Sequence, residues 1–517
     1  NKGGEYRKWY GNNVNVVDYE NDGFDIKEEK AENLRLGLIE KKNSQCWNSE
    51  FYFKEALTWS RISSSNFGIR YSPTGFIFDT AGTCIFANQR LLKYLLGLLS
   101  SNVVREILLI LNPTLTFQTG DISKIPVILS ENDFGTISKV DSSIDLSRAD
   151  WDSFETSWDF KKHPLLRNVS TISEAFAQWQ AECDDRFNQL KANEEELNRI
   201  FIDIYGLQDE LTPEVEDKDV TVRKADLQRD IKSLLSYAVG CMFGRYSLDV
   251  TGLAYAGGKW EDVFINDPTV LDSEKTDGST ATLVGDYVKD KDGKMHLCTF
   301  APDADNVIPI TDEEYLDDDI VSRLCAWLKA VYGADTLEEN LDYIAKALRN
   351  KGSTSREIIR NYFLNDFFKD HCQTYSVTGS GKRPIYWLFD SGKQNGFKAL
   401  VYLHRYTPDT IGNLRIDYLH KMQRVYESEI NRMQDMMDHS ENAREVAAAS
   451  KRKDKLAKQL KECREYDEKI SHLALSRIEL DLDDGVKVNY RKLQTAQDGK
   501  FYEVLADSKN IMVKEKK

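Results

Sequence analysis

Proline, histidine and clustered cysteine are scarce in this sequence, and each scarcity excludes a class of protein. The 517 residues include only ten prolines, which excludes a Pro-rich linker protein. The seven histidines form no HExxH motif and no recognisable catalytic triad, so an independent hydrolase is not indicated. No two of the eight cysteines are closer than 27 residues, which leaves no CxxC-type motif. We therefore expect no metal site, and reduced cysteines in the core.

A long uncharged hydrophobic run is also missing. The most apolar stretch, residues 91–111, contains Lys93, Arg105 and Glu106. Charges near the middle disfavour a membrane span, so we predict one buried helix here. The chain opens on Asn1 without the charged and apolar regions of a signal peptide. Since an initiating Met is also absent, we expect a piece of a longer protein, located in the cytoplasm, with no membrane partner.

The composition is that of a globular chain with an uneven charge. It is 41% hydrophobic and 30% charged, which suffices for several buried cores in two to four domains. The net charge is -16, and residues 203–320 carry all of it, with 27 acidic and 11 basic residues. Residues 373–405 are locally basic instead, with five basic residues and Asp390 alone as acid. Net acidity normally argues against nucleic acid as a partner, but here it is confined to one segment.

The hydrophobic periodicity predicts a mixed α/β (α+β), multi-domain fold. We expect a strand-rich domain over residues 1–135, a helical spacer over 136–205, an acidic and mostly helical domain over 206–372, and a basic strand unit with an antiparallel helix pair and a tail over 373–517. Helical spacing runs from Ile172 to Phe201, which predicts a helix of about 30 residues. Residues 114–128 are expected to be extended, and residues 483–494 are expected to be a β-rich tail.

Two motifs that would bind a nucleotide or cofactor are incomplete. Gly379-Ser380-Gly381-Lys382 resembles a phosphate loop, but Ser376 stands where the pattern needs Gly, and Pro384 blocks a following helix. We read it as a hairpin turn. A DNA adenine methyltransferase would need a Gly-rich cofactor turn and an Asn-Pro-Pro-aromatic loop. Asn112-Pro113-Thr114 lacks the second Pro and the aromatic residue, and no suitable Gly-rich turn exists. We therefore predict no catalytic residue in this chain.

The opening sequence KGGEYRKWYGNN has the residue types of a nucleic-acid contact. Its glycines allow close approach of the backbone, its basic residues suit phosphate, and its aromatic residues can stack on bases. The amides of Asn12 and Asn13 can pair with base edges. The alternative is a capped strand end with solvated basic residues.

Four stretches of the sequence resemble one protein family. KGGEYRKWYGNN resembles the segment that follows the catalytic domain in the PglX family, the adenine-specific DNA methyltransferases of BREX phage-defence systems. LLKYLLGLLSSNVVREILLILNPTLTFQTGDISKIPVI resembles the helix and return strand of target recognition domains. KANEEELNRIFIDIYGL and RPIYWLFDSGKQNGFKALVYLHRY resemble later PglX segments.

The resemblance implies a function that the composition does not show. It implies sequence-specific recognition of double-stranded DNA by residues 1–135 as a target recognition domain, which delivers a flipped adenine to a catalytic domain absent from this chain. S-adenosylmethionine would be bound by that missing N-terminal catalytic domain, and this chain alone would be inactive. Other BREX defence proteins are the expected partners.

Carried over to matching positions, the resemblance gives three groups of DNA-binding candidates. The opening motif supplies Lys2, Arg7, Lys8, Trp9, Asn12 and Asn13; the strands of the first domain supply Arg61 and Arg70; the C-terminal hairpin supplies Lys382, Arg383 and Lys393. Two other functions stay open. The chain could be a protein-interaction scaffold of a defence complex, or the recognition half of a single-chain restriction-modification enzyme with a nuclease upstream.

Overall fold

The computed structural model describes residues 1–37, 46–63, 65–130, 133–266, 286–377 and 381–512. They group into two compact units. Unit 1 comprises Asn1–Phe160 and Gln178–Ala225, and unit 2 comprises Lys161–Ala177 and Asp226–Lys517. The mixed α+β, multi-domain fold is confirmed. The four segment boundaries expected from the sequence stay a prediction.

Unit 1 is built around a small antiparallel sheet with strand order β2-β1-β3. Its strands are β1 (Ala56–Ser60), β2 (Ile69–Ser72) and β3 (Gly82–Ile85). Its helices are α1 (Glu20–Arg35), α2 (Gln89–Leu99), α3 (Asn102–Leu111), α4 (Thr119–Ile122), α5 (Phe134–Trp151) and most of α6 (Ile172–Tyr205), with short 3-10 turns at Ser49–Phe51 and Asp217–Asp219.

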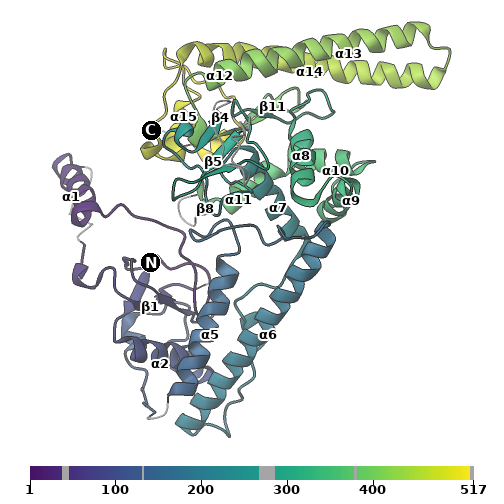
Figure 1. The fold of residues 1–517 in the computed structure, drawn as a ribbon. Coiled ribbons are helices and arrows are strands. Elements are labelled where there is room, and N and C mark those ends of the chain that lie inside the picture. Colours follow the sequence, from purple (N-terminus) through teal and green to yellow (C-terminus); the bar gives the residue numbers. More distant parts are fainter. Residues whose placement is uncertain (38–45, 64, 131–132, 267–285, 378–380, 513–517) are drawn as a thin grey trace, which may run out of the picture. The chain divides into compact units, whose positions relative to one another are not determined.

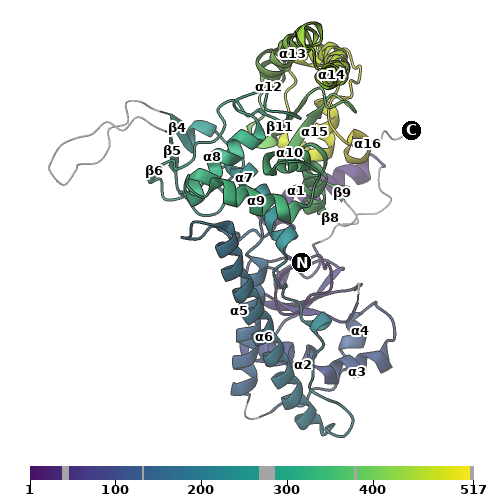
Figure 2. The ribbon, with the colours of Figure 1, turned by 90° about the vertical axis from the view of Figure 1, so that its right-hand side faces the viewer.

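The core of unit 1 lies on one face of this sheet. Successive strand residues point to opposite faces, so Leu57, Trp59 and Ile69 share a face and are fully buried. They belong to one hydrophobic cluster with residues of α2, α5 and α6, including Leu96, Val140, Leu190 and Phe201. Figures 1 and 2 both show α5 beside α6. The long predicted helix is confirmed, and within unit 1 it contributes to the core.

Over its described residues, unit 2 combines helices with three small sheets. Its helices are α7 (Leu227–Met242), α8 (Ile320–Tyr332), α9 (Leu337–Leu348), α10 (Ser355–Asn365), α11 (Phe367–Thr374), α12 (Thr410–Asn413), α13 (His420–His439), α14 (Ala443–Ser476), α15 (Val486–Lys492) and α16 (Ser508–Ile511), with a π-helical turn at Leu414–Leu419 and 3-10 turns at Trp260–Asp262, Leu403–Arg405 and Leu482–Asp484.

The sheets of unit 2 are all antiparallel. The first sheet has the strand order β10 (Tyr386–Asp390), β11 (Lys398–Tyr402), β7 (Ile308–Pro309). The second has the order β4 (Phe264–Asn266), β5 (Asp286–Lys289), β6 (Met295–Leu297). The third consists of β8 (Ser376–Val377) paired with β9 (Gly381–Lys382). The predicted C-terminal strands and the antiparallel helix pair α13–α14 are confirmed, and the two paired helices are clearly visible in Figure 1. Leu456, Cys463 and Ile470 repeat every seven residues along α14 and are buried, and Leu460 between them is buried as well.

Three local predictions are wrong. The apolar run 91–111 forms two helices bent by 71°, because the Ser101 hydroxyl accepts a hydrogen bond from Val104 N and caps a new helix at α3. Residues 114–128 include the turn of helix α4, where Gln118 and Asp121 form a capping box. The tail forms α15 instead of strands, because Tyr490 and Leu493 bury one helical face. Gly379 and Ser380 of the phosphate-loop candidate lie outside the described residues.

Candidate nucleic-acid interface

Residues 1–4 of the opening segment pack on the face of the unit 1 sheet opposite the core, whereas Trp9 lies at the edge of the sheet and belongs to the core cluster. Trp9 N donates to Ile69 O at 2.9 Å and Tyr71 N donates to Trp9 O at 2.8 Å, so Trp9 forms a parallel bridge beside β2. Ser60 Oγ donates to Gly4 O at 3.0 Å. A Cβ on Gly3, whose φ is +81°, would lie 2.8 Å from Ala81 O. The glycines therefore permit close approach to the protein's own sheet.

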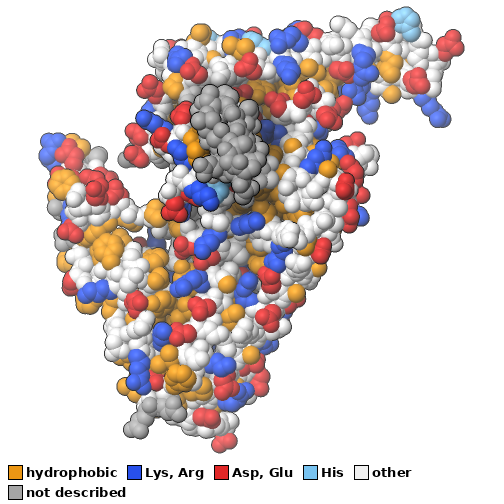
Figure 3. Space-filling view, viewed as in Figure 1, with side chains coloured by type: hydrophobic (Ala, Val, Ile, Leu, Met, Phe, Trp, Pro, Cys, Tyr) orange, Lys and Arg blue, Asp and Glu red, His pale blue; other side chains and the backbone are white. Residues whose placement is uncertain are grey.

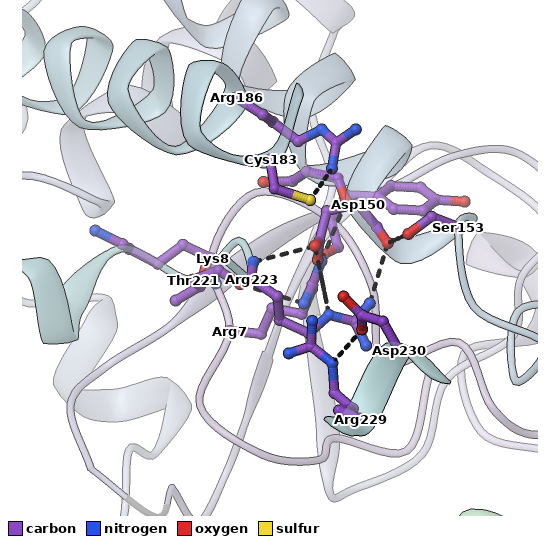
Figure 4. A network of polar contacts seen from close by, with 12 residues as sticks. Arg7, Lys8, Asp150, Ser153, Cys183, Arg186, Thr221, Arg223, Arg229 and Asp230 are labelled. Carbon is purple, nitrogen blue, oxygen red and sulfur yellow. Dashed lines mark hydrogen bonds and ion pairs between the residues drawn. The ribbon is translucent and has the colours of Figure 1, made fainter. Parts of the chain in front are cut away.

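Arg7 lies at the centre of a buried polar network (Figure 4). Its Nη2 donates to Asp150 Oδ2 at 2.8 Å and to Ser147 O at 3.1 Å, and its Nε donates to Tyr10 O at 2.6 Å. Arg223 approaches the same carboxylate, with Nε 3.3 Å from Oδ2. Burial alone would raise the pKa of the Asp150 carboxyl, but the Arg223 and Arg7 guanidiniums outweigh it and hold that pKa below its usual range.

Lys8 and Trp9 share a second buried acid. The Lys8 ammonium pairs with Oε2 of Glu194 on α6, and Trp9 Nε1 donates to Glu194 Oε1 at 2.6 Å. Burial alone would lower the pKa of Lys8, but the Glu194 carboxylate reverses the direction and raises it. Lys8 is therefore charged and paired inside the protein, and Trp9 has no accessible face.

Arg70 is buried without the pairing that the other two basic residues have. Its side chain is on the face of the sheet where the opening segment packs, and the residue is only 2% exposed. Among the described residues, Nε and Nη1 of Arg70 have no hydrogen-bond partner. Burial, aided by the positive charge of Arg7, lowers the pKa of Arg70 to about 10. Arg7, Lys8, Trp9 and Arg70 therefore do not present their side chains to a ligand in this structure.

The other unit 1 candidates remain accessible. Lys2 and Arg61 are exposed, and Asn12 and Asn13 are half-buried. Asn12 has a φ of 65° and its amide Nδ2 donates to Glu5 O at 2.9 Å, so it stabilises a turn. That geometry matches the alternative of a capped segment end for Asn12. Asn13 hydrogen-bonds Tyr10 through its side chain.

The three hairpin candidates of unit 2 differ from one another. Lys382 Nζ lies 2.6 Å from Asp507 Oδ2, and this pair raises the pKa of Lys382. Arg383 and Lys393 are exposed. The loop that carries Lys393 is fixed to α14, because Glu462 accepts hydrogen bonds from Ser391 Oγ and from the backbone N–H groups of residues 394 and 396. Arg383 and Lys393 are thus the basic residues of this group that are most available to an anion.

A hollow of about 380 Å³ in unit 1 escaped the sequence analysis. Its aromatic lining comes from separate stretches of the chain, namely Tyr10, Tyr19, Phe53, Phe76, Phe78, Trp151 and Trp158. No spacing rule connects these positions. The aromatic-rich but aperiodic composition of residues 150–164 was the available signal, and it does not indicate a pocket by itself.

The described residues contain no group of three or more His, Cys, Asp or Glu side chains that could hold a metal ion. No single helix there has the length and apolar character to cross a membrane. The bent pair α2 and α3 passes that test together, by length and composition only.

Two curated relatives match almost the whole chain. Adenine-specific methyltransferase PglX of Lacticaseibacillus casei (strain Zhang) is 44% identical over 504 residues, which are 96% of this chain and 38% of that protein. The chain is homologous to PglX. Adenine-specific methyltransferase BrxX of Escherichia coli O9:H4 (strain HS) is 35% identical over 534 residues, which are 99% of this chain and 40% of that protein.

The resemblance to PglX proteins expected from the opening motif is thereby confirmed along nearly the whole chain. No family model matches the chain. The chain spans about two fifths of the length of these two relatives. Their names describe proteins more than twice as long as this chain.

Proposed function

We propose that this chain is the DNA-recognition part of an adenine-specific methyltransferase in a BREX phage-defence system. The observation that carries the proposal is the match of 96% and 99% of the chain to two adenine-specific methyltransferases of which it spans only 38% and 40%. A methyltransferase that acts on adenine within DNA needs both a catalytic part and a part that selects the site. The sequence supports the second role.

The catalytic role falls to another part of the longer protein in this proposal. The chain has no Gly-rich cofactor turn, and Asn112-Pro113-Thr114 lacks the features that hold a flipped adenine. Asn112 is instead used structurally, because its Nδ2 donates to Thr116 O and to Asp121 Oδ2. S-adenosylmethionine would supply the methyl group when bound by that other part. Because bacterial DNA lies in the cytoplasm, we propose that the protein is located there.

The DNA-contacting residues in the proposal are the accessible ones. Polar or charged groups are accessible to solvent in unit 1 at Lys2, Arg61 and Asn13. In unit 2 they are accessible at Arg383 and Lys393. Basic side chains bind phosphates and position the protein, whereas amides can read base edges. Arg7, Lys8 and Trp9 have a different part in this proposal: they fix the opening segment that carries Lys2 and Asn13.

Binding of the isolated chain to a labelled duplex tests the proposal. Phosphate contacts release condensed counterions, so the logarithm of the association constant should fall linearly with the logarithm of the salt concentration. We expect binding with such a negative slope. A chain that binds no duplex at low salt would favour the protein-interaction scaffold.

The restriction-modification alternative is tested on the longer protein. A protein that also cuts DNA should cleave an unmethylated plasmid when Mg²⁺ is added, whereas the proposed methyltransferase should leave it intact. The proposed partnership with other BREX proteins predicts that the longer protein co-purifies with them.

A further inference from the structure

The hollow in unit 1 lies beside the opening segment and is rich in aromatic rings. Figure 3 shows hydrophobic side chains on the surface next to α1. Tyr19 packs edge-on against Tyr52 and Phe53, with both pairs of ring centroids 5.5 Å apart, and Phe78 lies 5.1 Å from Tyr52. These rings lie outside the main hydrophobic cluster of unit 1. A volume of about 380 Å³ is in the range of sites for small planar ligands.

Two of the rings are held in place by cations. The Arg7 guanidinium carbon lies 5.0 Å from the centroid of Trp151, and that of Arg148 lies 4.9 Å from the centroid of Tyr10. A Cβ on Gly11 would lie 2.8 Å from Trp151 Cε3, so only glycine lets the backbone close on this ring. Arg7 is itself fixed by Asp150. Trp151 and Tyr10, two rings of the wall, are therefore backed by positive charge.

The polar groups of the hollow match the edge of a nucleobase. Asn13 and Asn15 supply amides, which can donate to and accept from a base edge. Asp79 and Asp159 supply carboxylates, which accept hydrogen bonds from an exocyclic amine and repel a phosphate. Lys2, also part of the lining, supplies an ammonium that is suited to an adjoining phosphate.

We infer that this hollow holds a single unstacked base of DNA, preferentially one with an exocyclic amine. The inference rests on the proposed function, because it takes DNA to be the ligand of this chain. Aromatic faces stack with any base, and such stacking adds to the electrostatic affinity for single-stranded nucleic acid. Trp158 is 59% exposed at the hollow and provides an accessible face on which a base can stack.

Tryptophan fluorescence of the full chain tests the inference with two probes. One is a short single strand of deoxyadenosine, and the other is a strand of equal length made of abasic sugar-phosphate units. Their charges are equal, so phosphate binding contributes equally to both. We expect the deoxyadenosine strand to bind about tenfold more tightly.

Two variants assign that preference to the hollow. Trp158→Ala should remove most of the preference, and so should Phe53→Ala, whose side chain also lines the hollow and is 47% exposed. Trp47→Ala is the matched control, because Trp47 is 69% exposed and does not line the hollow. The control variant should keep the preference.

The outcomes separate this inference from the proposed function. Equal binding of both strands by the wild type, or an unchanged preference in Trp158→Ala and Phe53→Ala, overturns the inference. Binding of a labelled duplex by the same preparations would leave the proposed function standing in either case. Loss of duplex binding together with a retained preference for the base-bearing strand would reject duplex recognition instead.

Discussion

Arg7 Nη2 lies 2.8 Å from Asp150 Oδ2, although 143 residues separate the two along the chain and both side chains are buried. This pair ties the opening segment to the end of α5 within unit 1. It also explains why a basic residue in a motif typical of nucleic-acid binding is withheld from solvent. The opening segment owes its position to charges that the protein neutralises internally.

Loss of the Asp150 carboxylate should destabilise unit 1 strongly. Asp150→Ala leaves the buried Arg7 guanidinium without a carboxylate and removes the carboxylate that Arg223 also approaches, and an unpaired buried charge costs about 3–5 kcal/mol. We expect a clearly lower melting temperature. Asp141→Ala on the same helix is the control, because Asp141 is only half-buried and its pair with Lys93 is worth at most about 1 kcal/mol. Equal melting temperatures for the two variants would contradict the role of the network.

The same carboxyl should give unit 1 a defined acid sensitivity. Its pKa is lower in the folded protein than the usual value of about 3.9, so its ionised form stabilises the fold above about pH 4 and that contribution is lost as the pH falls through the folded pKa. The wild type should therefore be more stable than Asp150→Asn above about pH 4, and this difference in stability should shrink as the pH falls below about 4. Thermal unfolding of both proteins across this range measures it. A difference that does not change with pH would contradict the assignment.

Replacing Asn12 should affect the stability of the fold more than the affinity for DNA. Its φ of 65° is unfavourable for Ala, and its amide donates to Glu5 O, so Asn12→Ala should cost about 1 kcal/mol or more. Asn12→Gly keeps the backbone conformation and should cost less. Melting temperatures of the two variants, with Asn13→Ala for comparison, decide this. A large loss of affinity on one DNA sequence without a loss of stability would restore Asn12 as a base-reading residue.

The sequence predicted the long helices because periodicity is a local signal. Helix α6 and the α13–α14 hairpin follow from apolar spacing. The break between α2 and α3 was missed because both halves are apolar, and only the Ser101 cap separates them. Residues 483–494 alternate weakly, and their helix α15 is decided by burial of Tyr490 and Leu493.

The candidate site was harder to predict because burial is set by distant partners. Residue types identified Arg7 and Lys8 as phosphate ligands, but Asp150 and Glu194, which neutralise them, lie 143 and 186 residues further on. The resemblance to PglX located the opening segment, and it could not separate buried from exposed positions within it. The aromatic hollow had no sequence signature, because its rings come from the end of helix α5 and from several loops.

Arg383 and Lys393, the exposed basic residues of the C-terminal strand hairpin, should contribute equally to the affinity for every DNA sequence. Arg383→Ala combined with Lys393→Ala should weaken binding to all duplexes alike and reduce the salt slope by about two, one for each lost phosphate contact. Lys382→Ala should have a smaller effect, because Asp507 already neutralises Lys382. Titrations at several salt concentrations measure the slope, with Lys346→Ala of α9 as an exposed control. An unchanged slope in the double variant would remove the hairpin from the interface.

The helix pair of unit 2 should depend on its apolar seam. Leu460 of α14 is buried in the hydrophobic cluster that includes Met433 of α13, so Leu460→Asp places an unpaired charge in that core and should cost several kcal/mol. Lys461→Asp is the control, because the next residue along the helix is exposed. A melting temperature that falls equally in both variants would count against specific packing of Leu460.

Selection from a random duplex library tests most directly whether this chain reads DNA sequence. The chain is mixed with random double-stranded DNA at moderate salt, and the bound fraction is sequenced and compared with the input. Sequence recognition within an adenine-specific methyltransferase predicts enrichment of one short motif that contains an adenine. A bound fraction with the same sequence composition as the input would contradict the account.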